Sequence, residues 1–134
     1  MISLVIQPFW IKAQLADYAA CGGYNKKFKV SATLTVEKLD CDGFVVENLS
    51  FIHECRQSFR VAMYKASCEE LAQGITNIGH RMIGDRLESM MVRIFNLTGY
   101  IELNWVRGQG IPAFPRCATS TEKIETRKLS SRKK

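Results

Sequence analysis

Among the side chains of this chain that could ligate a metal or act as a nucleophile are two histidines, His53 and His80, and five cysteines. Neither histidine has a cysteine or carboxylate at ligand spacing, apart from Glu54 beside His53, so the pattern favours ordinary surface or core histidines over a metal site. The cysteines are odd in number and form no Cys-x-x-Cys pair, which predicts reduced, mostly buried thiols rather than disulfides or a zinc ribbon. They are Cys21, Cys41, Cys55, Cys68 and Cys117. We therefore expect neither a metal nor a cofactor.

Basic side chains offer a second kind of chemistry, contact with phosphate groups. Residues 117–134 contain six Lys and Arg against two Glu, so this segment holds most of the net charge of +6. Tyr24 and Phe28 add aromatic surface near the first basic run. Short basic tails often only keep a protein soluble, and that alternative stays open. The candidates for nucleic-acid contact are Lys26, Lys27, Lys29, Arg127, Lys128, Arg132, Lys133 and Lys134.

The segment 27–47 predicts the sheet that must position these residues. Apolar and polar side chains alternate over 28–36, which is typical of a strand with one buried and one polar face, and residues 40–43 have turn composition. The same alternation over 8–18 predicts a preceding strand with Pro8 at its entrance. The two strands are expected to form a hairpin.

Two helices are predicted next. An apolar side chain every fourth residue indicates a helix over 49–59 with Asn48 as its N-cap. Ser67 and Glu70 have the spacing of a capping box that starts a second helix, and Gly84 is its natural end.

Alternation over 90–95 and 101–106 then predicts a second hairpin. Two strands, two helices and two strands define an α+β fold, with a four-stranded antiparallel sheet and both helices on one face. We expect residues 1–116 to form a single domain and residues 117–134 to form a basic tail. No apolar run approaches the ~20 residues that a membrane helix needs, so we expect a cytoplasmic protein.

This order of elements, with three short motifs, resembles the tunnelling-fold (T-fold) superfamily, in particular the 6-pyruvoyl-tetrahydropterin synthase and 6-carboxytetrahydropterin synthase family. The motifs are Gly43-Phe44-Val45-Val46-Glu47, Ala66-Ser67-Cys68-Glu69-Glu70-Leu71-Ala72 and Val92-Arg93-Ile94-Phe95-Asn96. The resemblance implies that several subunits join their sheets into a barrel around a tunnel. It also implies that a flat purine- or pterin-like ring binds where subunits meet.

The chain departs from this family at its catalytic positions. Gln14 and the segments 25–27 and 60–64 stand where the family has its zinc-binding histidines and its Asp-His relay. Cys21 lies near the place of the family's reactive cysteine and is the one catalytic candidate, with a packing role as the alternative.

The resemblance also implies a ring-binding site at Asn96, with Thr98 beside it, and at Glu69. Asn96 stands where the family has a Glu, and an amide can still pair with a ring edge. The alternatives are that Asn96 only begins a turn and that Glu69 only favours the first turn of a helix.

Three functions remain open from the sequence. The first is binding without catalysis, in a homo-oligomeric ring that holds a planar purine- or pterin-like ligand, a nucleotide or a protein partner. The second is a drifted enzyme of pterin or deazapurine biosynthesis. The third is nucleic-acid binding through basic tails repeated around a ring.

Overall fold

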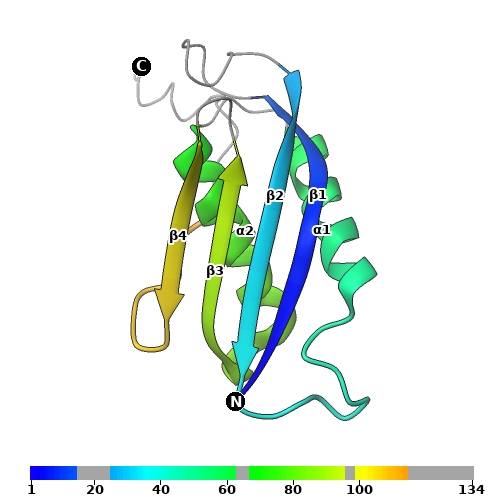
Figure 1. Cartoon of the computed structure of the whole chain (residues 1–134), viewed down its shortest axis with the longest axis vertical. Coiled ribbons are helices and arrows are strands. Elements are labelled where there is room, and N and C mark those ends of the chain that lie inside the picture. The colour runs from blue at the N-terminus through cyan, green and yellow to red at the C-terminus, as the bar shows by residue number, and fades with distance from the viewer. Residues whose placement is uncertain (15–24, 63–66, 96–98, 115–134) are drawn as a thin grey trace, which may run out of the picture.

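Alternating strands and amphipathic helices assemble into two layers. The computed structural model describes residues 1–14, 25–62, 67–95 and 99–114, with side chains except at 13–14, 25–27 and 60–62. Four strands form an antiparallel sheet in the order β1-β2-β3-β4, and α1 and α2 cover one face of it (Figure 1). The elements are β1 (Ile2–Gln14), β2 (Asn25–Val36), α1 (Asn48–Ala62), α2 (Cys68–Ile83), the short 3₁₀ helix η1 (Gly84–Arg86), β3 (Leu87–Phe95) and β4 (Tyr100–Val106). The predicted α+β class is confirmed. In the described ranges, no helix is long and apolar enough to cross a membrane.

The core lies between the helices and the inner face of the sheet. The predicted alternation of β2 is confirmed, because its apolar residues from Phe28 to Val36 are buried and Lys29 between them is exposed. Each large aliphatic or aromatic side chain buried here contributes about 1.5–3 kcal/mol. From the helices, the core receives Phe51, Cys55, Phe59, Leu71, Ile75 and Ile78.

A β-bulge shapes β1. This strand begins at Ile2 and not near Pro8 as predicted. Ile6 pairs with Ala32 and Phe9 pairs with Val30, so β1 holds one more residue than β2 between these pairs. Pro8 lies in this bulge on an edge strand, where the missing N–H costs no ladder hydrogen bond. The extra residue lets Ile6 and Phe9 both face inward, although strict alternation places residues three apart on opposite faces.

The two helices begin differently. Ser67 and Glu70 make both hydrogen bonds of the predicted capping box, and α2 ends at Gly84 as predicted. In α1 the predicted N-cap Asn48 is wrong. Instead, the carboxylate of Glu47 accepts hydrogen bonds from the backbone N–H groups of Leu49 (3.2 Å) and Ser50 (2.9 Å). The Glu47 side chain therefore caps the first turn of α1.

Candidate functional site

The face of the sheet that the helices leave uncovered, which we call the outer face, carries a row of aromatic and basic side chains. Strand pairing aligns Trp10 with Lys29, Lys29 with Phe95, and Phe95 with Tyr100. One residue from each of the four strands therefore forms a continuous line across the sheet. We call these four residues the aromatic row.

The contacts within the aromatic row are those of cations and aromatic rings. The Nζ atom of Lys29 lies 5.9 Å from the centroid of the Trp10 ring and 5.9 Å from that of the Phe95 ring. The Phe95 and Tyr100 rings are tilted, with centroids 5.5 Å apart. Trp10 is 52% exposed and Tyr100 is 50% exposed. About half of each of these two side chains is therefore accessible to another ring that stacks on it.

A second cation lies beside the row. The guanidinium of Arg93 lies 4.7 Å from the Tyr100 ring centroid, and its Nε donates a hydrogen bond to Glu102 at 2.9 Å. Glu102 also accepts a hydrogen bond from Asn104 at 2.8 Å. The bonds from Asn104 and Arg93 lower the pKa of Glu102, so this carboxylate stays ionised and holds Arg93 against the tyrosine.

Three of the residues predicted to contact nucleic acid, Lys26, Lys27 and Lys29, lie on β2. The backbone of Lys26 pairs with Ala13 and that of Lys27 with Lys12, a few residues from Lys29 along β2. The side chains of Lys26 and Lys27 lie outside the described residues, and so does the whole of the basic tail. Phe28 does not supply the predicted aromatic surface, because it faces inward and is 6% exposed.

Of the three predicted ring-binding residues, Glu69 lies among the described residues. Glu69 is exposed in the first turn of α2. Asn96 and Thr98 lie outside the described residues. In the sequence they follow Phe95, the last residue of β3, and precede Tyr100, the first residue of β4. The ring-binding site predicted from these three residues stays a prediction.

Among the described cysteines, Cys41 and Cys55 carry free thiols. Cys55 and Cys68 are buried as predicted, whereas Cys41 is exposed because it lies in the turn after β2. Burial raises the pKa of the Cys55 thiol, which keeps it protonated and unreactive. Cys21 and Cys117 lie outside the described residues. Among the residues that the structure describes, no three His, Cys, Asp or Glu side chains gather as a metal site would require.

Sequence reasoning missed most of the aromatic row. Trp10 lies between two buried residues, Phe9 and Ile11. Phe95 follows the buried Ile94, and Tyr100 precedes the partly buried Ile101. This alternation assigns all three aromatic residues to the outer face. Their alignment depends on the register of three strand pairs, which no local pattern encodes.

The described fold defines an α+β protein with an exposed aromatic sheet face. Searches of protein-family models, curated proteins and solved structures found no match for this chain. Membership of the T-fold superfamily therefore stays a prediction.

Proposed function

We propose that this chain is a binding protein whose outer face takes up single-stranded nucleic acid, with bases stacked on the aromatic row and phosphates near Lys29 and Arg93. The observation that carries this proposal is the alignment of Trp10, Lys29, Phe95 and Tyr100 across all four strands. Open aromatic rings next to cations are the usual means of holding unpaired bases.

An extended ligand fits this face better than a small enclosed one. Trp10 and Tyr100 lie on the two edge strands, three strand spacings or about 14 Å apart. Sites for small molecules are concave and cover most of their ligand, whereas these two rings are about half exposed. The net charge of +6 adds long-range attraction for a polyanion.

The test is the affinity for a fluorescent oligonucleotide of about 12 nucleotides, as oligo(U) and oligo(dT), by fluorescence anisotropy. Trp10→Ala and Tyr100→Ala should each weaken binding at least about fivefold, or ~1 kcal/mol. Lys29→Gln should weaken binding and reduce its salt dependence. Matched controls are Phe44→Ala and Lys38→Gln, which change exposed residues in the segment between β2 and α1.

Equal losses in the control and test variants would contradict the aromatic row as the binding site. Deletion of residues 117–134 distinguishes nucleic-acid binding by the aromatic row from binding by the predicted basic tail. If only this deletion abolishes binding, the tail binds nucleic acid and the outer face does not.

A single nucleotide or another planar ring is the second candidate ligand. The observation that favours it is the position of the Lys29 ammonium at equal distance from the Trp10 and Phe95 rings, where one phosphate and one base could be held together. Calorimetric titration with adenosine and guanosine monophosphates tests this candidate. A mononucleotide that binds as tightly as the oligonucleotide would favour it.

A homo-oligomeric T-fold ring remains part of the proposal. β1 and β4 are the edges of the described sheet, and pairing them between subunits would remove both edges. The outer face would then line the tunnel, because the helices cover the other face. Native mass spectrometry tests this assembly, and a monomer at all concentrations would contradict it.

Stoichiometric zinc or turnover of dihydroneopterin triphosphate would instead support the drifted enzyme.

A further inference from the structure

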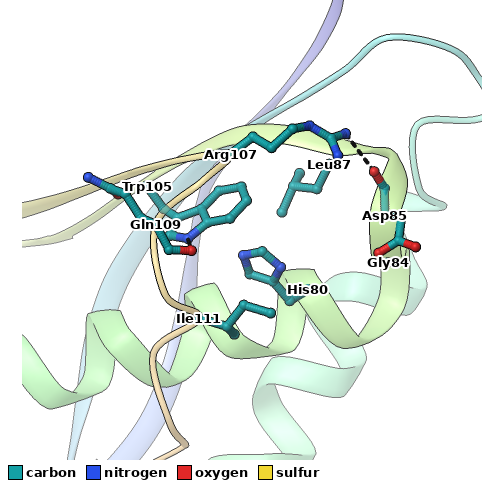
Figure 2. Close-up of a pocket in the computed structure, with 8 residues that line it drawn as sticks. All are labelled: His80, Gly84, Asp85, Leu87, Trp105, Arg107, Gln109 and Ile111. Carbon is teal, nitrogen blue, oxygen red and sulfur yellow. Dashed lines mark hydrogen bonds between the residues drawn. The ribbon is translucent and has the colours of Figure 1, made fainter.

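A pocket lies at the opposite end of the sheet from the aromatic row. It has a volume of about 350 Å³ and opens where α2 ends, β3 begins and the chain leaves β4 (Figure 2). This volume is near the lower end of the range for small-molecule sites. Its walls include the apolar side chains of Leu87, Trp105 and Ile111 and the polar side chains of His80, Arg107 and Gln109.

His80 supplies a hydrogen-bonding group without a partner. Its Nε2 atom is the one buried side-chain nitrogen or oxygen in the described residues that makes no hydrogen bond. Burial also lowers the pKa of His80, which favours the neutral ring. Because Nε2 is buried, the imidazole has to turn toward the pocket to pair with a ligand. That pairing would recover part of the ~1–3 kcal/mol that an unpaired buried polar atom costs.

Trp105 packs against the imidazole of His80. The two rings meet edge to face, with centroids 4.0 Å apart and an interplanar angle of 88°. The indole Nε1 of Trp105 in turn donates a hydrogen bond to the backbone carbonyl of Gln109 at 3.3 Å. Figure 2 shows both rings pointing into the same space between α2 and the chain after β4.

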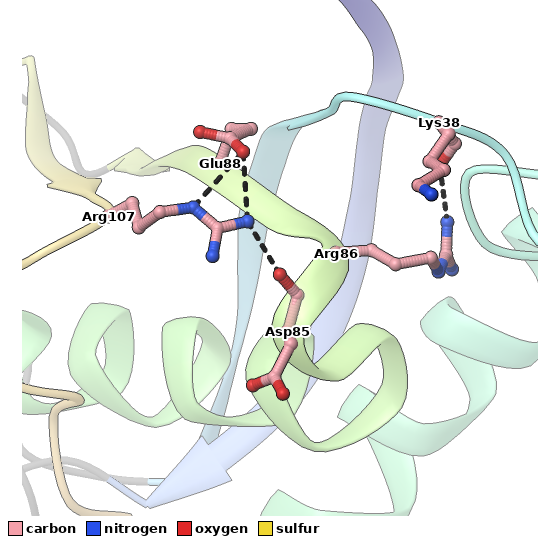
Figure 3. Close-up of polar contacts among 5 residues, drawn as sticks. All are labelled: Lys38, Asp85, Arg86, Glu88 and Arg107. Carbon is pink, nitrogen blue, oxygen red and sulfur yellow. Dashed lines mark hydrogen bonds and ion pairs between the residues drawn. The ribbon is translucent and has the colours of Figure 1, made fainter.

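The rim of the pocket is held by polar contacts that also set its charge. Arg107 binds the carboxylate of Glu88 through two nitrogens, with Nε at 3.0 Å and Nη2 at 2.9 Å from Oε2 (Figure 3). Nη2 also donates a hydrogen bond to the backbone carbonyl of Asp85. Arg86 points away and donates to the carbonyl of Lys38 at 3.0 Å. The charge of Arg107 is therefore already balanced by Glu88, and Asp85 adds a negative charge nearby, which disfavours an anionic ligand.

From these observations we propose that the pocket binds a small, neutral, planar nitrogen heterocycle that exchanges one hydrogen bond with Nε2 of His80. The apolar walls receive the ring body, and the imidazole pairs with one ring nitrogen. This site is independent of nucleic-acid binding on the outer face, because it lies at the start of β3 whereas Phe95 ends that strand. Failure of one proposal leaves the other standing.

The test uses indazole and its hydrocarbon analogue indene, which has the same bicyclic shape without ring nitrogens. Titration into the ¹⁵N-labelled full chain, followed by two-dimensional NMR, should shift the Trp105 indole N–H signal with indazole. Indene should bind at least about tenfold more weakly, because it leaves the imidazole nitrogen unpaired.

Two variants locate the site. His80→Phe keeps a ring but removes the nitrogen and should weaken indazole binding about tenfold, whereas His53→Phe, at an exposed position of α1, should leave it unchanged. Ile111→Trp adds bulk at the 58% exposed mouth of the pocket and should block binding without disturbing the core. Equal affinity for indazole and indene, unchanged binding by both pocket variants, or shifts that map to Trp10 would each overturn the proposal.

Discussion

Arg56 of α1 donates a hydrogen bond from Nε to the backbone carbonyl of Trp10, with a donor–acceptor distance of 2.9 Å. β1 is an edge strand of the described sheet. The hydrogen bond ties the edge strand to the helix layer at the residue that opens the aromatic row.

Replacing Arg56 by Ala should lower the free energy of unfolding by about 0.5–1.5 kcal/mol, the usual net value of one hydrogen bond. Urea unfolding gives this value. His53→Ala, at an exposed position on the same helix, should change it by less than about 0.5 kcal/mol. Equal effects of the two substitutions would show that the bond to Trp10 contributes nothing to stability.

Deletion of Pro8 should be tolerated, because the register shows one surplus residue in β1 between Ile6 and Phe9. Without that residue, Ile6 and Phe9 lie two apart and still face inward by ordinary alternation. We expect a change of less than about 1 kcal/mol in the free energy of unfolding.

The deletion should also increase concentration-dependent self-association, because an edge without its bulge and proline is longer and flatter. Analytical ultracentrifugation measures this association, and Pro8→Ala, which keeps the bulge, is the control. Unfolding of the deletion variant would mean that the pairing of β1 with β2 differs from the register described.

Gly79→Ala should destabilise the protein by up to about 2 kcal/mol. A Cβ atom at Gly79 would lie 2.8 Å from Cε of Met90, the flexible end of a buried side chain of β3, so this thioether would have to move within the core. This overpacking costs ~1–3 kcal/mol and exceeds the ~1 kcal/mol that Ala gains over Gly in helix propensity.

The loss should shrink when Met90→Val is introduced together with Gly79→Ala, since the smaller side chain vacates the space. Gly99→Ala is the control, because its Cβ would meet nothing within 4 Å. Stabilisation by Gly79→Ala alone would show that α2 lies farther from the sheet.

Glu47 should make stability depend on pH. Hydrogen bonds from the Ser50 side chain, the Ser50 N–H and the Leu49 N–H lower its pKa below the ordinary value of 4.5. A lowered pKa in the folded state means that this contribution is present above about pH 4.5 and is lost as the pH falls through the folded value. Glu47→Gln should therefore remove part of the loss of stability on acidification.

Unfolding of wild type and Glu47→Gln at neutral pH and at about pH 3 measures this difference. Asp42→Asn, which changes an exposed carboxylate in the preceding turn, is the control substitution. A carbon-13 titration that places the pKa of Glu47 above 4.5 would contradict the capping role.

The residues of this chain determine its local structure and the faces of its elements. Alternation assigns Lys29 to the exposed side of β2 and Val30 to the core, and the spacing of Ser67 and Glu70 is sufficient to start α2. These features depend on neighbours a few residues away, so periodicity and capping rules can recover them.

Only the tertiary structure decides which distant residues meet. Trp10, Lys29 and Phe95 become neighbours through strand register and one bulge, and His80 meets Trp105 because α2 packs on the inner face near the end of β4. Register and helix packing result from the total burial of many side chains. A pattern within one segment therefore predicts the two faces of each strand but not the partners across them.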